Sequence, residues 1–217
     1  MKLTYREKIS ELIYSGNVII GCYIFLFLLT LIVTFLFNDN LFNIKYNNIS
    51  IHPIKSLLTI SLPMFVALCL FPIIIEKTIK KSNPKEIGFV HFSKIDPLSK
   101  GIISVCIIVI LMVFILQGWS LVLPLFIHYL IVGLGEEILF RGIFQRRLQK
   151  VFNPYTAIII TSFIFAFQFH TLGTIKENLF YRLPLGLLLG FVYYKCKNIW
   201  PNFMIHTAYN FVLVSYN

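Results

Sequence analysis

Long apolar runs alternate with short polar and basic segments along most of the chain. A membrane-spanning helix needs roughly 20 mostly apolar residues, and several of these runs approach or exceed that length. The predicted spans cover residues 17–37, 56–75, 101–117, 120–140, 155–171, 183–195 and 199–216. The pattern therefore predicts an all-α fold, a polytopic bundle of about seven transmembrane helices.

The composition agrees with this prediction. Hydrophobic residues make up 58% of the 217 positions and charged residues 13%, whereas soluble domains average about 25% charged residues. The first apolar run is longer than the core of a secretory signal peptide, and no small-residue cleavage site follows it. We therefore expect an uncleaved first span and a multi-pass protein of the cell membrane. Pro63 and Pro72 predict a kinked second span, which neighbouring helices tolerate in a membrane.

The basic residues orient the predicted bundle. With the N-terminus in the cytoplasm, 15 of the 19 Lys and Arg residues fall on the cytoplasmic side, in line with the positive-inside rule. This placement also accounts for the net charge of +10, so we expect no nucleic-acid partner. The charged segment 76–100 is predicted to lie on the cytoplasmic surface near anionic lipid. It separates an N-terminal anchoring region, residues 1–100, from residues 101–217, which hold the candidate chemistry.

Two adjacent acids stand inside apolar sequence in the stretch GLGEEILFRG, residues 133–142. Glu137 and Arg141 are four residues apart, so on a helix they share a face and are expected to pair. Glu136 lies about 100° around the same helix and is left to point elsewhere. Acids within membrane spans are functional candidates; the alternative is a pair of interfacial charges without chemistry. The alternation of apolar and basic residues up to Phe152 predicts an amphipathic extension out of the membrane.

A histidine lies at the end of the next apolar run. Asn153 and Pro154 form a turn and helix-start signal, and Asn153 stands 17 residues from both Glu136 and His170. In a hairpin around this turn the two side chains lie at the same depth. A carboxylate facing an imidazole suits a general base or a metal site. The alternative is a histidine that only packs in the core.

The last apolar run places His206 and Asn210 on one helix face, because they are four residues apart. Either they only hydrogen-bond neighbouring helices, worth about 0.6 kcal/mol each in lipid, or they join Glu136 and His170 in one site. An acid, two histidines and an amide on three nearby helices favour the site. His128 is interpreted as a packing residue or a support for the site.

The order of these motifs resembles the CPBP family, the CAAX-processing and bacteriocin-processing intramembrane endopeptidases, also called Abi proteins. The resemblance covers residues 120–217, approximately. The residues that match its E-E-x-x-x-R and H-x-x-x-N motifs are Glu136, Glu137, Arg141, His206 and Asn210.

The middle motif of the family, usually F-x-x-x-H, is matched at its histidine alone. His170 stands in the expected place, but Ala166 occupies the position of the phenylalanine. Phenylalanines lie beside it, at positions 165, 167 and 169. The resemblance therefore implies that His170 corresponds to the histidine of the family motif. It assigns no role to an aromatic residue.

The resemblance implies hydrolysis of a peptide bond within the membrane. It implies that Glu136 and His170 activate the attacking water, as a general base does. His206 and Asn210 would then stabilise the oxyanion.

The resemblance also bears on the support of the site and on a metal. It implies that Glu137 and Arg141 hold the site together. Proteins of the family are often labelled metalloproteases, and a zinc ion, if present, would be held by Glu136, His170 and His206. The sequence contains no H-E-x-x-H motif. We favour a metal-free mechanism, because an oxyanion role already accounts for His206.

Three substrate classes follow from the resemblance: a prenylated tail, a leader peptide or bacteriocin-type precursor, and another membrane protein. The expected partners are the lipid bilayer and such a peptide or protein. The alternative function is an inert membrane scaffold or immunity protein that binds and regulates a membrane partner. A proton-coupled transporter is disfavoured, because such proteins commonly carry an internal repeat and the sequence shows none.

Overall fold

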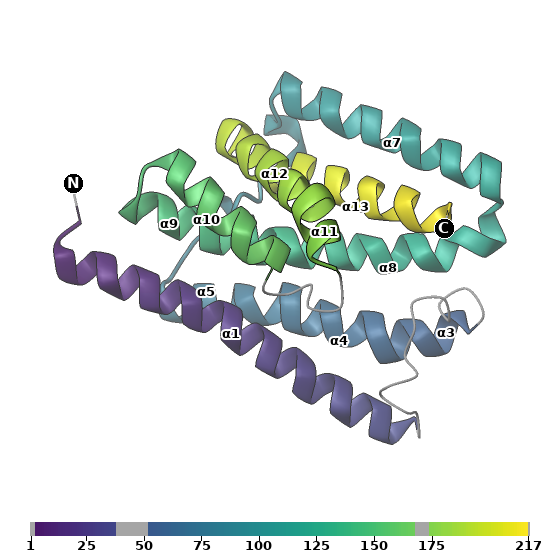
Figure 1. The fold of residues 1–217 in the computed structure, drawn as a ribbon, viewed down its shortest axis with the longest axis horizontal. Helices are drawn as coiled ribbons and strands as arrows, with labels where there is room; N and C mark the ends of the chain where they lie inside the picture. Colours follow the sequence, from purple (N-terminus) through teal and green to yellow (C-terminus); the bar gives the residue numbers. More distant parts are fainter. Residues whose placement is uncertain (1–2, 38–51, 168–173, 217) are drawn as a thin grey trace.

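The computed structural model describes residues 3–37, 52–167 and 174–216, and these residues form helices and connecting turns without a strand (Figure 1). The front half comprises α1 (Tyr5–Leu36), α3 (Pro53–Ser56), η2 (Leu57–Ser61), α4 (Leu62–Met64), η3 (Phe65–Leu70), α5 (Phe71–Ile79), α6 (Pro84–Ile87) and η4 (Phe92–Lys94). The back half comprises α7 (Pro97–Gln117), α8 (Trp119–Glu137), η5 (Ile138–Gln145), α9 (Arg146–Val151), α10 (Pro154–Phe167), α11 (Ile175–Glu177), η6 (Asn178–Arg182), α12 (Leu183–Cys196) and α13 (Ile199–Ser215).

Each predicted span overlaps a helix, and the all-α class is confirmed. Within the described residues, four continuous helices are long and apolar enough to cross a membrane: Tyr5–Leu36, Pro53–Ile79, Pro97–Gln117 and Val122–Val151. Helix α10 is apolar but shorter, and the end of the predicted span 155–171 lies outside the described residues. The chain is a membrane protein built as a helical bundle. Its orientation across the membrane stays a prediction.

The second predicted span is a single run of helix with irregular turns at its prolines. The π-helical turns η2 and η3 end just before Pro63 and Pro72. A proline has no N–H to donate and its ring crowds the preceding turn, so the wider π turns accommodate it without ending the helix. The irregularity therefore occurs where the sequence predicted a kink.

Helix α8 lies at the centre of the fold. It packs against α13 on one side and against η3 on the other, while α13 packs in turn against α7 and α12 (Figure 1). Two apolar clusters fill the space, one around Phe140 and Ile143 and the other around Phe114 and Phe211. The continuous helix α8–η5–α9 thus brings residues 133–147 into contact with both halves of the chain.

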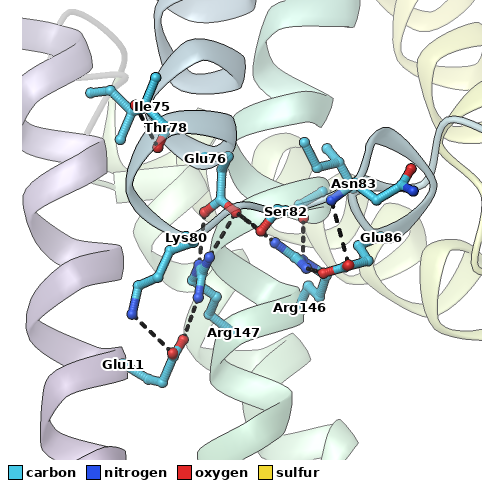
Figure 2. A network of polar contacts seen from close by, with 12 residues as sticks. Glu11, Ile75, Glu76, Thr78, Lys80, Ser82, Asn83, Glu86, Arg146 and Arg147 are labelled. Atoms are coloured by element: carbon cyan, nitrogen blue, oxygen red, sulfur yellow. Dashed lines mark hydrogen bonds and ion pairs between the residues drawn. The ribbon is translucent and has the colours of Figure 1, made fainter.

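A network of ion pairs joins this central helix to the front half, as Figure 2 shows. Glu76 of α5 is fully buried and accepts from Nε and Nη2 of Arg147 at 2.8 and 2.7 Å. Arg147 also reaches Glu11 of α1 at 2.5 Å, and Nη2 of Arg146 lies 2.8 Å from Glu76. Ser82 donates a further hydrogen bond to Glu76 at 2.7 Å. The carboxylates of α1 and α5 therefore hold the two arginines of α9.

This network changes the interpretation of the segment that follows Arg141. The sequence predicted that this segment leaves the membrane as an amphipathic extension. Arg147 is instead only 1% exposed and paired with two glutamates. The reason is that Glu11 and Glu76, far away in the sequence, face α9 and compensate its charge. The side of the extension that carries Arg147 and Leu148 is buried in the core, whereas Lys150 is exposed.

Candidate active site

Glu137, the last residue of α8, is the centre of a buried polar cluster. Its Oε1 lies 2.9 Å from Nδ1 of His206, and its Oε2 accepts from Nδ2 of Asn202 at 3.2 Å. Nε of Arg141 lies 3.4 Å from the same Oε2. All four side chains are at most 2% exposed. Both oxygens of this carboxylate are therefore engaged, as a buried charge requires.

Arg141 pairs with Glu137 across one helical turn, as its spacing predicted. Its guanidinium carbon also lies 4.9 Å from the centre of the Phe165 ring, within the range of a cation–π contact. Nη2 of Arg141 donates to the carbonyl of Gly186 on α12 at 3.4 Å. Arg141 therefore ties the central helix to α10 and α12 and neutralises Glu137.

His206 lies between the two adjacent glutamates. While its Nδ1 contacts Glu137, its Nε2 lies 3.7 Å from Oε2 of Glu136. An ionised Glu137 only accepts hydrogen bonds, so Nδ1 of His206 carries a proton and Nε2 is turned toward Glu136. The ring of Phe165 meets the imidazole edge-on, with centroids 5.6 Å apart. The imidazole is thus held in one orientation and tautomer.

Glu136 differs from its neighbour. It is 7% exposed, and its Oε2 has no hydrogen-bond partner within residues 3–37, 52–167 and 174–216. The distance of 3.7 Å to His206 exceeds that of a hydrogen bond. A buried carboxylate oxygen without such a partner has acceptor capacity for a water molecule or a substrate group.

The structure brings together four of the six predicted site residues: Glu136, Glu137, Arg141 and His206. Asn210 lies one turn beyond His206 on α13 and is partly exposed. His170 falls outside the described residues, so its predicted place opposite Glu136 stays a prediction. The catalytic roles of all these residues stay proposals as well.

Two residues of the cluster were missed from the sequence, Asn202 and Phe165. Asn202 stands four residues before His206, just as Asn210 stands four residues after it, so the same helical spacing was a usable signal. Phe165 stands one position before the place where the family motif has its phenylalanine. It contacts both Arg141 and His206, so an aromatic side chain reaches the site from the neighbouring position.

A metal site is not assembled by the described part of the chain alone. Within those residues no group of three His, Cys, Asp or Glu side chains is placed to hold an ion. Glu137 is occupied by Arg141, Asn202 and His206, which leaves Glu136 and Nε2 of His206 as donors. Protein zinc sites use three or four such donors. The set of Glu136, His170 and His206 stays a prediction, because one member is not described.

His128 also lies on α8, but it makes its contact away from the cluster around Glu137. It is fully buried, and its Nδ1 lies 2.9 Å from the hydroxyl of Ser61 on η2. This contact joins the second helical run to α8. This contact is consistent with a packing residue, and a supporting role of His128 for the site stays a prediction.

A comparison with known proteins finds one family model that matches the segment containing this cluster. A search of curated proteins and a search of solved structures found no match. A family model described as "Type II CAAX prenyl endopeptidase Rce1-like" matches residues 117–212. This range contains the whole polar cluster and supports a CAAX-type intramembrane endopeptidase in general. Residues 117–212 thus match the Rce1-like type II CAAX prenyl endopeptidases, and the resemblance to the CPBP family is confirmed for this part of the chain.

Proposed function

We propose that this protein is an intramembrane endopeptidase that hydrolyses a peptide bond in a membrane-associated peptide or protein. The observation that carries the proposal is the contrast between the two adjacent glutamates. Glu137 is saturated by three partners, whereas Glu136 is buried beside Nε2 of His206 with an oxygen that lacks a hydrogen bond in the described part of the chain. This contrast suits one supporting and one reacting carboxylate.

The proposed mechanism gives each acid its own task. Glu136, with His170, takes a proton from the attacking water as the water oxygen bonds to the scissile carbonyl carbon. In its protonated form His206 presents an Nε2–H toward the site, and with the amide of Asn210 it stabilises the oxyanion. The proton on Glu136 then passes to the leaving amine as the C–N bond breaks.

The charges of the cluster support this scheme. Arg141 balances the carboxylate of Glu137, and a protonated His206 would lie between Glu136 and Glu137. In that protonation state two carboxylates and two cations would give no net charge, which would limit the cost of burying ions. A zinc ion held by Glu136, His170 and His206 would supply Lewis-acid polarisation of the carbonyl. We favour the metal-free form.

The substrate class is the finer part of the proposal. The description of the matching family names CAAX prenyl endopeptidases, so a prenylated C-terminal tail is the first substrate to test. A leader peptide or bacteriocin-type precursor is the next. We place the protein in the cell membrane as a multi-pass chain, with the N-terminus and the active site toward the cytoplasm.

The test is an inventory of membrane and secreted peptides by mass spectrometry. Cells carrying the wild-type protein are compared with cells carrying Glu136→Gln at matched protein levels, and Glu86→Gln, at an exposed carboxylate, is the control. A peptide produced by wild type and the control but not by Glu136→Gln supports the proposal and identifies the substrate. Identical inventories, together with full rescue of a loss-of-protein phenotype by Glu136→Gln, would overturn it in favour of an inert scaffold.

A further inference from the structure

We infer that Asn202 is a positioning residue of this site, which fixes the carboxylate of Glu137 and through it the imidazole of His206. The inference rests on the proposed function for its effect on turnover. The contact itself is independent of that function. No motif singled out in the sequence includes Asn202.

The carboxamide of Asn202 has a determined orientation. Asn202 is fully buried, and its Nδ2 donates to Oε2 of Glu137 at 3.2 Å and to the carbonyl of Leu189 at 2.6 Å. A carbonyl oxygen and an ionised carboxylate only accept hydrogen bonds, so the NH2 group is the only end of the amide that fits here. The side chain is therefore a double donor that links α12, α13 and the end of α8.

Arg141 does not duplicate this contact. Its Nε lies 3.4 Å from Oε2 of Glu137 as an ion pair, but this nitrogen makes no hydrogen bond within the described residues. The guanidinium supplies charge, which has little directional preference. Asn202 supplies a directional hydrogen bond. The two partners of Oε2 therefore have different effects, and the orientation of the carboxylate depends on the amide.

The effect passes to His206 because both partners lie on one helix face. Asn202 and His206 are one turn apart on α13 and hold the two oxygens of Glu137. With Oε2 fixed by the amide, Oε1 is directed at Nδ1 of His206. Nε2 of His206 is then directed toward Glu136. Asn202 acts on the reaction only through these two side chains.

The variants for the test separate positioning from packing. Asn202→Leu has a similar size and removes both donors. Asn202→Ser is smaller, and its hydroxyl can bond a carbonyl of its own helix, so it provides a second variant if the leucine protein fails to accumulate. The matched control is Thr207→Val, which removes a buried hydrogen bond from α13 to the carbonyl of Tyr129 on α8 at 3.3 Å without touching Glu137.

The first readout is cleavage of a synthetic peptide with a farnesylated Cys-aliphatic-aliphatic-X ending by the purified full-length protein. We expect Asn202→Leu and Asn202→Ser to lower kcat by about 10- to 100-fold, with KM changed little and Thr207→Val close to wild type. The second readout is the 15N spectrum of histidine-labelled protein, assigned for His206 by its absence in His206→Gln. Loss of Asn202 should weaken the Nδ1–H signature of His206.

Failure of the inference on Asn202 can be distinguished from failure of the proposed function. If both Asn202 variants keep the wild-type kcat and the His206 signals, the inference is wrong, and equal losses in Thr207→Val would reduce it to general packing. If the wild-type protein shows no cleavage that depends on Glu136, the substrate proposal fails instead. The 15N spectra then decide alone whether Asn202 positions His206.

Discussion

Nδ1 of His206 lies 2.9 Å from Oε1 of Glu137. This contact joins two residues 69 positions apart in the sequence and gives two adjacent acids different surroundings. Glu137 becomes a fully engaged support, and Nε2 on the opposite edge of the imidazole is turned to Glu136. The geometry therefore separates residues that hold the site from a residue with acceptor capacity left for chemistry.

The two glutamates should differ in their contribution to stability. Glu137→Gln leaves Arg141 buried without its charge partner and disturbs the contacts to Asn202 and His206, so we expect a loss of about 3–5 kcal/mol in the free energy of unfolding. Glu136→Gln should lose far less, because its Oε2 makes no hydrogen bond within the described residues. Thermal unfolding of both variants in the same detergent measures this difference. Equal losses would contradict the assignment of separate tasks.

The ion-pair network of the front half should stabilise the fold in proportion to burial. Glu76→Gln removes the charge that faces both Arg146 and Arg147, and we expect a loss of about 3–5 kcal/mol. Glu86→Gln, at the 56% exposed end of the same network, should cost about 0–1 kcal/mol. Unfolding midpoints of the two variants provide the comparison. A larger effect at Glu86 would show that the buried carboxylate does not hold α9.

The close packing of the central helix against Ile87 should require a glycine at position 142. A Cβ at Gly142 would lie 2.7 Å from the backbone oxygen of Ile87 and 2.6 Å from its Cγ2, so Gly142→Ala should destabilise by about 1–3 kcal/mol. Gly101→Ala on α7 meets no atom within 4 Å and should stabilise by about 0.4–1 kcal/mol. Opposite signs of the two shifts in melting temperature are expected. Two shifts of the same sign would count against this packing.

The aromatic contact to Arg141 gives a fourth prediction. Phe165→Leu keeps the site apolar but removes the ring that faces the guanidinium of Arg141 and the edge of His206. We expect a loss on the order of 2 kcal/mol, the size of a desolvated cation–π contact. Phe163→Leu, where the ring is 49% exposed, is the control. Equal unfolding temperatures of the two variants would show that the contacts of Phe165 do not stabilise the site.

The local parts of this structure followed from the sequence. Runs of apolar residues indicated the helices, because a helix in lipid must satisfy its own backbone and present apolar side chains. The pair of Glu137 and Arg141 followed from its spacing of four residues, since neighbours on a helix face are fixed by the helical repeat. The separate direction of Glu136 followed from the same repeat.

Tertiary packing decided what lies opposite each of these faces. The helical repeat sets the direction of a side chain around its own axis, but the partner depends on which helix packs there and how closely. Thus His206 faces both glutamates, Asn202 joins the cluster, and Arg147 is buried against Glu76. These contacts join segments 65 to 71 residues apart, and such separations carry no periodic signal in a single sequence.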